Sequence, residues 1–260
     1  MTETLNAAAA RLRAAYTEGP VGPLRDALAP TDVDGAYAVQ TLNTRYWEGQ
    51  GRRIIGRKAG LTAKAVQAQL GVDQPDFGVL FDDMQIADGG VLDPARALQP
   101  KAEAEIAFVL GQDLPGLDTT PEMVAEAIAS VHAAIEIVDS RIADWKITFA
   151  DTVADNGSSA FFVLSADGRG LPGLDLWSCG MVMEINREVV SLGAGAAVLG
   201  HPLNAVAWLA RTLAARGEPL TAAQIVLAGA LGPMVALKPG DHVRAVIGGV
   251  GEVSFNFKEA

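Results

Sequence analysis

The segment PKAEAEIAFVL, residues 100–110, decides the fold because its side chains alternate in character along the chain. Small or apolar residues occupy every second position, and the positions between them begin with Lys101, Glu103 and Glu105. This period of two predicts a β-strand on which both glutamates point to the same face, roughly 6.6 Å apart. The same face continues into small and apolar residues, which indicates that the two carboxylates stand at a partly buried surface.

A third glutamate lies in a similar apolar setting. Glu136 stands between two isoleucines in AAIEIVDSR, residues 133–141. Carboxylates that meet in a medium of low dielectric cannot all stay ionised without a cation. Three carboxylates without histidine or cysteine form a hard ligand set that suits Mg²⁺ or Mn²⁺ better than Zn²⁺. The alternative, in which Glu103 and Glu105 belong to a solvated strand face, stays open on the pattern alone.

Composition and charge limit the class of protein. The 260 residues are 50% hydrophobic and carry a formal net charge of -11, which predicts a globular chain that repels polyanions and binds no nucleic acid. A single cysteine excludes an internal disulfide framework, and the first residues lack a signal-peptide profile. The apolar runs are far shorter than the ~18 residues of a membrane span. We therefore expect a cytoplasmic protein with no membrane anchor.

The order of the predicted elements indicates an α+β fold. Helical spacing in three segments predicts an N-terminal helical portion, residues 1–77, whereas residues 78–260 read as a mixed β portion that contains two further helices. The strands do not alternate regularly with crossover helices, so we expect a mainly antiparallel structure and one integrated domain. The predicted helices cover residues 5–15, 32–49, 61–71, 119–134 and 204–217, and the last two strands form a hairpin.

Three other segments offer candidate functional side chains. Arg57 and Lys58 in GRRIIGRKAGLT either form a solvated turn or contact a ligand, and a lysine near a metal can have a lowered pKa and transfer protons. Because the protein is acidic, either cation could help to admit an anionic substrate. Asp76 in DQPDFG is a turn former or a functional group. Ser158 lies in a polar run just before the apolar strand AFFVL, where loops often bind ligands.

Several of these segments together resemble the 2-keto-4-pentenoate hydratases, also called 2-hydroxypentadienoate hydratases, of the meta-cleavage pathways. The resemblance covers nearly the whole chain and is carried by residues 51–84, 101–110, 135–156, 199–211 and 228–235. These enzymes belong to the wider fumarylacetoacetate-hydrolase-like superfamily. The resemblance implies N-terminal helices plus a mainly antiparallel β-roll or barrel of the fumarylacetoacetate hydrolase C-terminal type. It also implies a homo-oligomer, and it makes association with neighbouring pathway enzymes conceivable.

The resemblance also implies roles for particular residues. Glu103, Glu105 and Glu136 correspond to the ligands of one divalent cation. Lys58 of the K-x-G-L-T motif and Asp76 of the P-D-[FY]-G motif correspond to catalytic groups, and Ser158 corresponds to a substrate contact. The chain departs from its relatives at two positions: Gly157 replaces a common alanine, which could loosen Ser158, and Ala228 replaces a frequent threonine, so a hydroxyl contact is absent there.

The implied reaction adds water to 2-hydroxypenta-2,4-dienoate, a small 2-hydroxydienoic acid, and gives 4-hydroxy-2-oxopentanoate. Two alternatives remain. The segment VVSLGAGAAVLGHPL, residues 189–203, looks more like a 4-oxalocrotonate decarboxylase, whereas GALGPMV, residues 229–235, looks like a hydratase. A catalytically silent subunit that stabilises a partner enzyme is the second alternative, and the intact set of glutamates with Lys58 argues against it.

Overall fold

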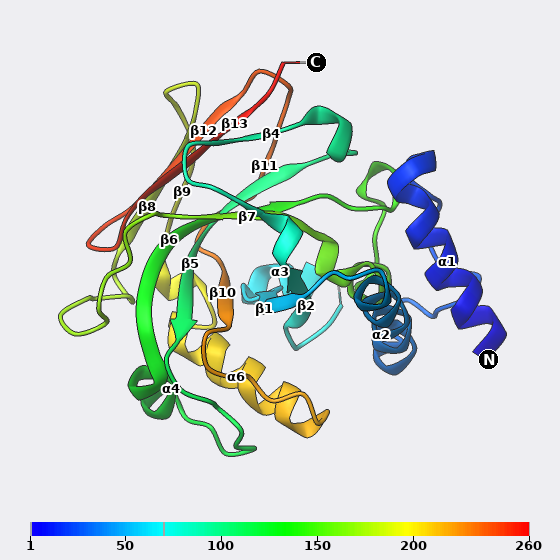
Figure 1. The fold of residues 1–260 in the computed structure, drawn as a ribbon, viewed down its shortest axis with the longest axis horizontal. Helices are drawn as coiled ribbons and strands as arrows, with labels where there is room; N and C mark the ends of the chain where they lie inside the picture. The colour runs from blue at the N-terminus through cyan, green and yellow to red at the C-terminus, as the bar shows by residue number, and fades with distance from the viewer. Residues whose placement is uncertain (1, 70, 260) are drawn as a thin grey trace.

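Two β-sheets form the centre of the molecule, and the two N-terminal helices lie at one end of it (Figure 1). The structure is a computed structural model that describes residues 2–69 and 71–259. Its α-helices are α1 (Thr2–Glu18), α2 (Val33–Gly49), α3 (Lys64–Gln69), α4 (Pro121–Ala127), α5 (Phe149–Ala154) and α6 (Pro202–Ala215). In the part of the chain described, no helix has the length and apolar character needed to cross a bilayer.

The larger sheet is strongly curved, and its two longest strands, β5 and β6, follow that curve side by side (Figure 1). Its strand order is β2 (Asp76–Phe81), β1 (Ile54–Gly60), β10 (Ile225–Ala230), β5 (Lys101–Leu110), β6 (Ile128–Val138), β7 (Ser159–Leu164) and β3 (Gln85–Ile86), and β11 (Val235–Ala236) pairs with β5. Most pairs are antiparallel, but β1 with β10 and β3 with β7 are parallel. The predicted strand 100–110 is thus β5, and the α+β, mainly antiparallel fold class is confirmed.

The smaller sheet packs against strands β6 and β7 of the larger one. Its order is β4 (Gly90–Leu92), β13 (Gly251–Phe257), β12 (His242–Ile247), β8 (Gly180–Ile185) and β9 (Glu188–Ala194). Strands β12 and β13 form the predicted hairpin, with Val243 opposite Phe255, and both strands contact β6. Alternate residues of the hairpin are buried between the sheets, and burial of this apolar surface is what holds the two layers together.

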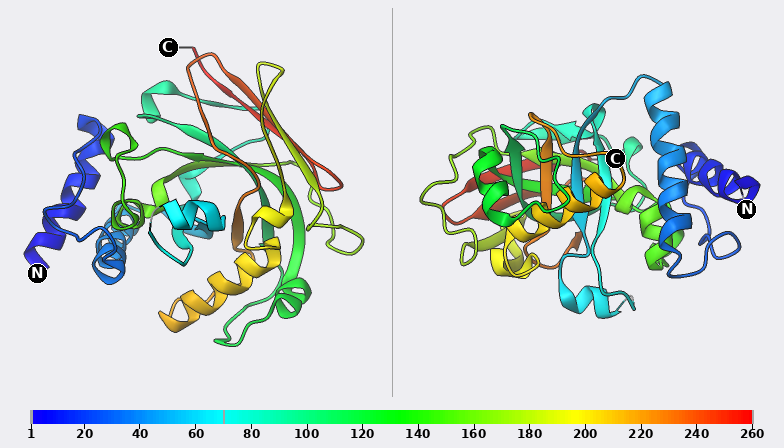
Figure 2. Two further views of the ribbon diagram at one scale, coloured as in Figure 1. Left: turned by 180° about the vertical axis from the view of Figure 1, so that it is seen from behind. Right: turned by 90° about the horizontal axis from the view of Figure 1, so that it is seen from below.

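The N-terminal helices form where the sequence predicts them. Leu12 and its small neighbours on one face of α1 are buried, and α1 packs on α2 (Figure 2). Asp32 caps α2 by accepting a hydrogen bond from the backbone N–H of Gly35. Strand β1 and the start of β2 also lie within residues 1–77, so the helical pattern accounts for only part of that range. The division of the chain at residue 77 stays a prediction.

The predicted helix 119–134 is wrong in its second half. Thr120 caps the helix and Pro121 takes its first position, as expected, but α4 ends at Ala127 and the chain continues directly as β6. Residues 128–138 pair with β5 along nearly its whole length, and most of them are buried. Strand pairing with burial on both faces overrides the local helical spacing there. The other predicted helix, 204–217, is confirmed as α6.

A wholly buried arginine ties the strand ends beside α5 together. The Arg141 guanidinium donates hydrogen bonds to the Asp155 carboxylate and to the backbone carbonyls of Asp139, Asp155 and Ser159. These bonds join the chain after β6 to the end of α5 and the start of β7. Removing one partner of a buried ion pair leaves the other charge uncompensated, which costs about 3–5 kcal/mol.

We therefore expect Arg141→Met to lower the free energy of unfolding by about 3–5 kcal/mol in urea titrations. The control is Arg25→Met, because the Arg25 side chain is exposed and makes one hydrogen bond to a carbonyl. Its effect should stay within about 0.5 kcal/mol. An Arg141→Met protein as stable as the wild type would contradict the role of this network.

Candidate active site

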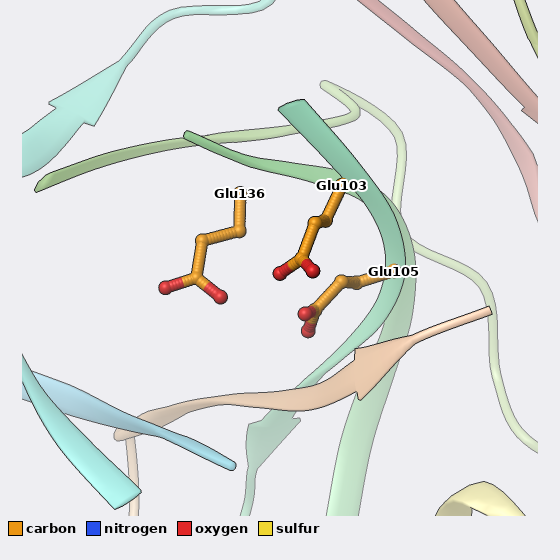
Figure 3. A group of neighbouring side chains, drawn as sticks. All are labelled: Glu103, Glu105 and Glu136. Atoms are coloured by element: carbon orange, nitrogen blue, oxygen red, sulfur yellow. The ribbon is translucent and has the colours of Figure 1, made fainter. Parts of the chain in front are cut away.

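The three glutamates converge on one point inside the curve of the larger sheet (Figure 3). Glu103 and Glu105 project from the same face of β5, and the strand register places Glu103 directly opposite Glu136 of β6. One carboxylate oxygen from each residue lies within 4.8 Å of the others. Glu105 and Glu136 are buried, and Glu103 is half-buried. The predicted convergence of two strand neighbours and a third, distant carboxylate is therefore present in the fold.

The donor atoms of this cluster fit a divalent cation. Glu105 Oε2 accepts a hydrogen bond of 2.8 Å from the Gly229 N–H, but Glu105 Oε1 and both Glu136 oxygens are buried with no hydrogen-bond partner among the described residues. Buried carboxylate oxygens without partners are costly. An oxygen-only set of three carboxylates is the type of site that Mg²⁺, Mn²⁺ or Ca²⁺ occupies, since it supplies both the charge and the ligands that these ions require.

Crowding of negative charge changes the acidity of the cluster. Burial, and then the Glu136 carboxylate, raise the pKa of Glu103 to about 7. Burial, with the Glu136 and Glu103 carboxylates, raises the pKa of Glu105 well above its usual range. Without a cation, the folded protein therefore holds protons on this cluster at pH values where free glutamates are ionised.

Lys58 and Asp76 lie beside the cluster on adjacent strands. Lys58 Nζ, from β1, is 3.5 Å from Glu136 Oε2, and Asp76 begins β2 opposite Gly60. A side chain at Gly60 would collide with them, because its Cβ would lie 2.1 Å from Asp76 Oδ1 and 3.0 Å from Lys58 Nζ. The missing side chain of Gly60 thus leaves the space in which the lysine and the aspartate approach each other.

The surroundings of Lys58 hold it in its charged form. Burial alone would lower its pKa, but the carboxylates of Glu136 and Asp76, followed by those of Glu103 and Glu105, raise the pKa above its ordinary value. This direction is opposite to the lowered pKa that the sequence suggested. Burial raises the pKa of Asp76, although Lys58 opposes that shift. The carboxyl group is therefore easier to protonate than a free aspartate.

Arg57 does not reach this group of residues. It follows Gly56 on β1, so its side chain leaves the strand on the face opposite to Lys58. The buried guanidinium forms an ion pair of 3.2 Å with Glu218 and donates to the Gly56 carbonyl. The structure therefore places this predicted substrate contact on the other side of the sheet.

Ser158 reaches the site from a tight turn between α5 and β7. Its Oγ lies 3.2 Å from the Thr152 Oγ1, so each hydroxyl can donate to the other. The preceding Gly157 has φ of +60°, and a Cβ there would lie 2.9 Å from Lys58 Cε. The bond to Thr152 holds the serine that Gly157 was expected to loosen. Ala228, the second departure, is buried in β10 and does not line the cavity.

These residues line a cavity of about 550 Å³. Glu105, Lys58 and Asp76 are buried, whereas the lining residues Leu192 and Met234 are 63% and 44% exposed. The charged groups therefore lie at the inner end, and apolar side chains form the mouth. Among the described lining residues Lys58 is the only lysine or arginine. The remaining apolar lining includes Leu61, Val66, Val138, Trp145, Ile147, Ala197, Ala230, Leu231 and Pro233.

Sequence reasoning missed several of these residues. Thr152 lies on α5 and Gly229 on β10, and although both stand in segments that carry the family resemblance, nothing in the sequence singled out either residue. Leu192 and Met234 come from the two segments that gave opposite indications, decarboxylase-like and hydratase-like. Those segments touch at the mouth of the cavity, where the Ser191 hydroxyl donates to the Pro233 carbonyl at 2.8 Å. Only the long-range strand order brings them together.

Comparison with known proteins places this arrangement in a family. The chain is 54% identical over 252 residues to 2-keto-4-pentenoate hydratase 2 of Dechloromonas aromatica (strain RCB), with 96% of each chain covered. It is 53% identical to 2-keto-4-pentenoate hydratase of Paraburkholderia xenovorans (strain LB400), over 92% of this chain and 89% of that one.

A solved structure is similar in fold over nearly the same length. This is the 4-oxalocrotonate decarboxylase from Pseudomonas putida G7 complexed with magnesium and adipate, which has a TM-score of 0.92 and 39% identity and covers 99% of this chain and 98% of that one. The family model described as fumarylacetoacetate (FAA) hydrolase C-terminal matches residues 53–258. The chain belongs to the fumarylacetoacetate hydrolase C-terminal family.

Proposed function

We propose that this protein is a metal-dependent hydratase that adds water to 2-hydroxypenta-2,4-dienoate and gives 4-hydroxy-2-oxopentanoate. The observation that carries the proposal is the convergence of three carboxylates with Lys58 and Asp76 at the inner end of a cavity whose mouth is apolar. The names of the relatives that are 53–54% identical support the same reaction. This substrate is an intermediate in the breakdown of aromatic compounds.

In this proposal Glu103, Glu105 and Glu136 hold one divalent cation, with Mg²⁺ as the ion of choice. When bound, the cation would supply Lewis acidity toward the carboxylate and 2-oxygen of the substrate. Three carboxylates and one dication leave one net negative charge, which the Lys58 ammonium cancels. Lys58 thus lets an anionic substrate enter a site built from acidic residues, whereas Arg57 pairs with Glu218 on the other side of the sheet and takes no part.

The remaining residues move protons and orient water. Ketonisation of the dienol removes a proton from the 2-hydroxyl group and delivers one to carbon, and hydration then places water on C4. Asp76 and Lys58 adjoin each other and are the pair that accepts and returns these protons. The hydroxyl groups of Ser158 and Thr152 are hydrogen-bonded to each other at the same cavity wall, where they can orient the attacking water.

The charge of the lining favours the hydratase over the decarboxylase. A decarboxylase substrate carries a second carboxylate at its far end. In this cavity that end would lie among Val66, Leu192 and Met234, with no lysine or arginine among the described lining residues to pair with it. A carboxylate taken out of water without a partner costs several kcal/mol. The cavity therefore suits a substrate with one carboxylate and an uncharged tail.

We expect kcat/KM for 2-hydroxypenta-2,4-dienoate to exceed that for 2-oxohexenedioate by at least ~100-fold, which corresponds to about 2.7 kcal/mol. The assay follows loss of dienoate absorbance in parallel with CO₂ release. Leu192→Arg should lower this ratio of the two kcat/KM values, because the added cation at the mouth of the cavity can pair with the second carboxylate of the diacid. Val190→Arg is the matched control, because Val190 is exposed on the same strand but does not line the cavity.

Three results would count against the proposal. Comparable kcat/KM values with CO₂ release from the diacid would identify a decarboxylase. A purified protein that stays inert on both substrates in the presence of Mg²⁺ would favour the silent subunit. Activity that survives complete removal of divalent ions by EDTA would contradict the metal-dependent reaction.

A further inference from the structure

The turn that presents Gly157 and Ser158 to the cavity is fastened to the neighbouring strand by one side chain. The Asn156 amide makes two hydrogen bonds with Val79 of β2: its Oδ1 accepts from the Val79 N–H at 2.7 Å, and its Nδ2 donates to the Val79 carbonyl at 2.9 Å. Strand β2 is at the edge of the larger sheet, so the side chain takes the place that a further strand would have.

The backbone of this turn is in an uncommon conformation. Asn156, Gly157 and Ser158 have φ of +59°, +60° and +54°, in the left-handed region. Asparagine and glycine tolerate this region better than most residues, whereas serine pays a steric cost there. The turn also comes very close to β2, because a Cβ on Gly78 would lie 2.4 Å from the Asn156 carbonyl oxygen. Such a conformation persists only where the surroundings impose it.

Packing behind the turn does not impose it. On the side away from the active site lies a second cavity of about 360 Å³, and Asp155, Asn156 and Ser159 line it together with residues of α1 and α2. The two ends of the turn are held, since Arg141 binds Asp155 and the Asp139 N–H donates to the Ser158 carbonyl. The middle of the turn, where Gly157 lies close to the Lys58 side chain, is attached to β2 through the Asn156 side chain.

We propose that Asn156 is a positioning residue for the reaction proposed above. By fixing the turn to the strand that also carries Asp76, it sets the places of Lys58 and Ser158 relative to the reacting atoms. Asn156 is not among the residues that line the active-site cavity, and its side-chain amide is bonded to the Val79 backbone. Small displacements of catalytic groups are expensive, because a misplacement of about 1 Å can cost ~100-fold in rate.

The test uses two substitutions that both accept a positive φ. Asn156→Gly removes both hydrogen bonds to Val79, whereas Asn156→Asp keeps an oxygen for the Val79 N–H and loses the donor. We expect kcat to fall by about 10- to 100-fold in Asn156→Gly and by less in Asn156→Asp. KM and the affinity for Mn²⁺, measured by titration of the protein without substrate, should change by less than about threefold, since the carboxylate cluster is untouched.

A second readout is independent of turnover. Amide exchange of Val79 should accelerate in Asn156→Gly and stay near the wild-type rate in Asn156→Asp. Asn43→Ala is the matched control, because Asn43 of α2 also lines the second cavity but accepts its hydrogen bond from Arg13. It should leave kcat and Val79 exchange unchanged.

The outcomes separate the two proposals. A wild-type protein that hydrates no 2-hydroxydienoate would remove the proposed function, and Val79 exchange would still report on the attachment. An active wild type with unchanged kcat in Asn156→Gly would overturn the positioning role. Loss of Mn²⁺ affinity in parallel with kcat would also overturn it, because the residue would then support the fold of the whole site.

Discussion

Replacing Glu105 by glutamine is expected to lower kcat/KM for the dienoate by at least ~100-fold and, in the same protein, to make the metal-free form more stable. The first effect follows from the loss of one charged ligand, since changes one step further from a metal already cost 10- to 100-fold. Glutamine keeps the shape of the side chain and an oxygen for the Gly229 N–H. The loss should therefore reflect charge rather than packing.

The second effect follows from the raised pKa of Glu105. Because the folded-state pKa lies above the unfolded value of about 4.5, the folded protein binds more protons, and its stability falls as pH rises above that value. The neighbouring Glu103, with a pKa of about 7, contributes the same loss up to roughly pH 7. Neutral glutamine removes part of this penalty, so the stabilisation should be clear at pH 8 and small at pH 5.

Thermal unfolding in EDTA and in MgCl₂ at both pH values measures the second effect. Wild type should gain stability from Mg²⁺, by about 2.7 kcal/mol at one hundred times Kd, and Glu105→Gln should gain much less. Glu126→Gln, on the exposed face of α4, is the matched control and should behave as the wild type. A Glu105→Gln enzyme with full activity and full stabilisation by Mg²⁺ would contradict the metal site.

The sequence predicts the central strand well because one of its faces carries charge. The alternation in residues 101–110 directly indicates β5 and the common direction of Glu103 and Glu105. The position of Glu136, the third carboxylate, cannot be predicted from such an alternation. Its position opposite Glu103 depends on the register between β5 and β6, and the helix-like spacing of residues 128–134 conceals the start of β6. The isoleucines on either side of Glu136 marked it as a third carboxylate in an apolar setting, and the likeness to a known family agreed, but no local pattern gave the register that places it opposite Glu103.

The sequence pattern also does not predict strand β1, for a related reason. Its central residues are buried on both faces, so its sequence lacks the alternation that marks a half-buried strand. Because Arg57 and Lys58 are consecutive residues of this strand, their side chains leave it on opposite faces. The Asn156–Val79 contact joins residues 77 positions apart in the chain, which no local pattern records. Thr152 contacts Ser158, only six residues away, but its place in the cavity depends on how α5 packs beside β1 and β2.

Replacing Lys58 by methionine is expected to lower kcat by about 10² to 10⁴-fold, the range that general acid–base groups contribute. Methionine fills a similar volume but can neither carry the charge that offsets the carboxylates nor exchange a proton. Lys58→Arg should restore little activity. A guanidinium does not release its proton, and the larger group would have to fit where Gly157 already lies close to the lysine stem.

Stability should change in the direction opposite to that of Glu105→Gln. Lys58 is the cation nearest to Glu136, and its removal leaves the buried carboxylates without compensation, so metal-free Lys58→Met should unfold at a lower temperature than wild type. Mg²⁺ should then restore more stability to Lys58→Met than to wild type, because the added dication replaces the missing charge. Lys238→Met, at an exposed turn, is the control for loss of a lysine. If both Glu105→Gln and Lys58→Met destabilised the metal-free protein, repulsion within the cluster could not be what governs this site.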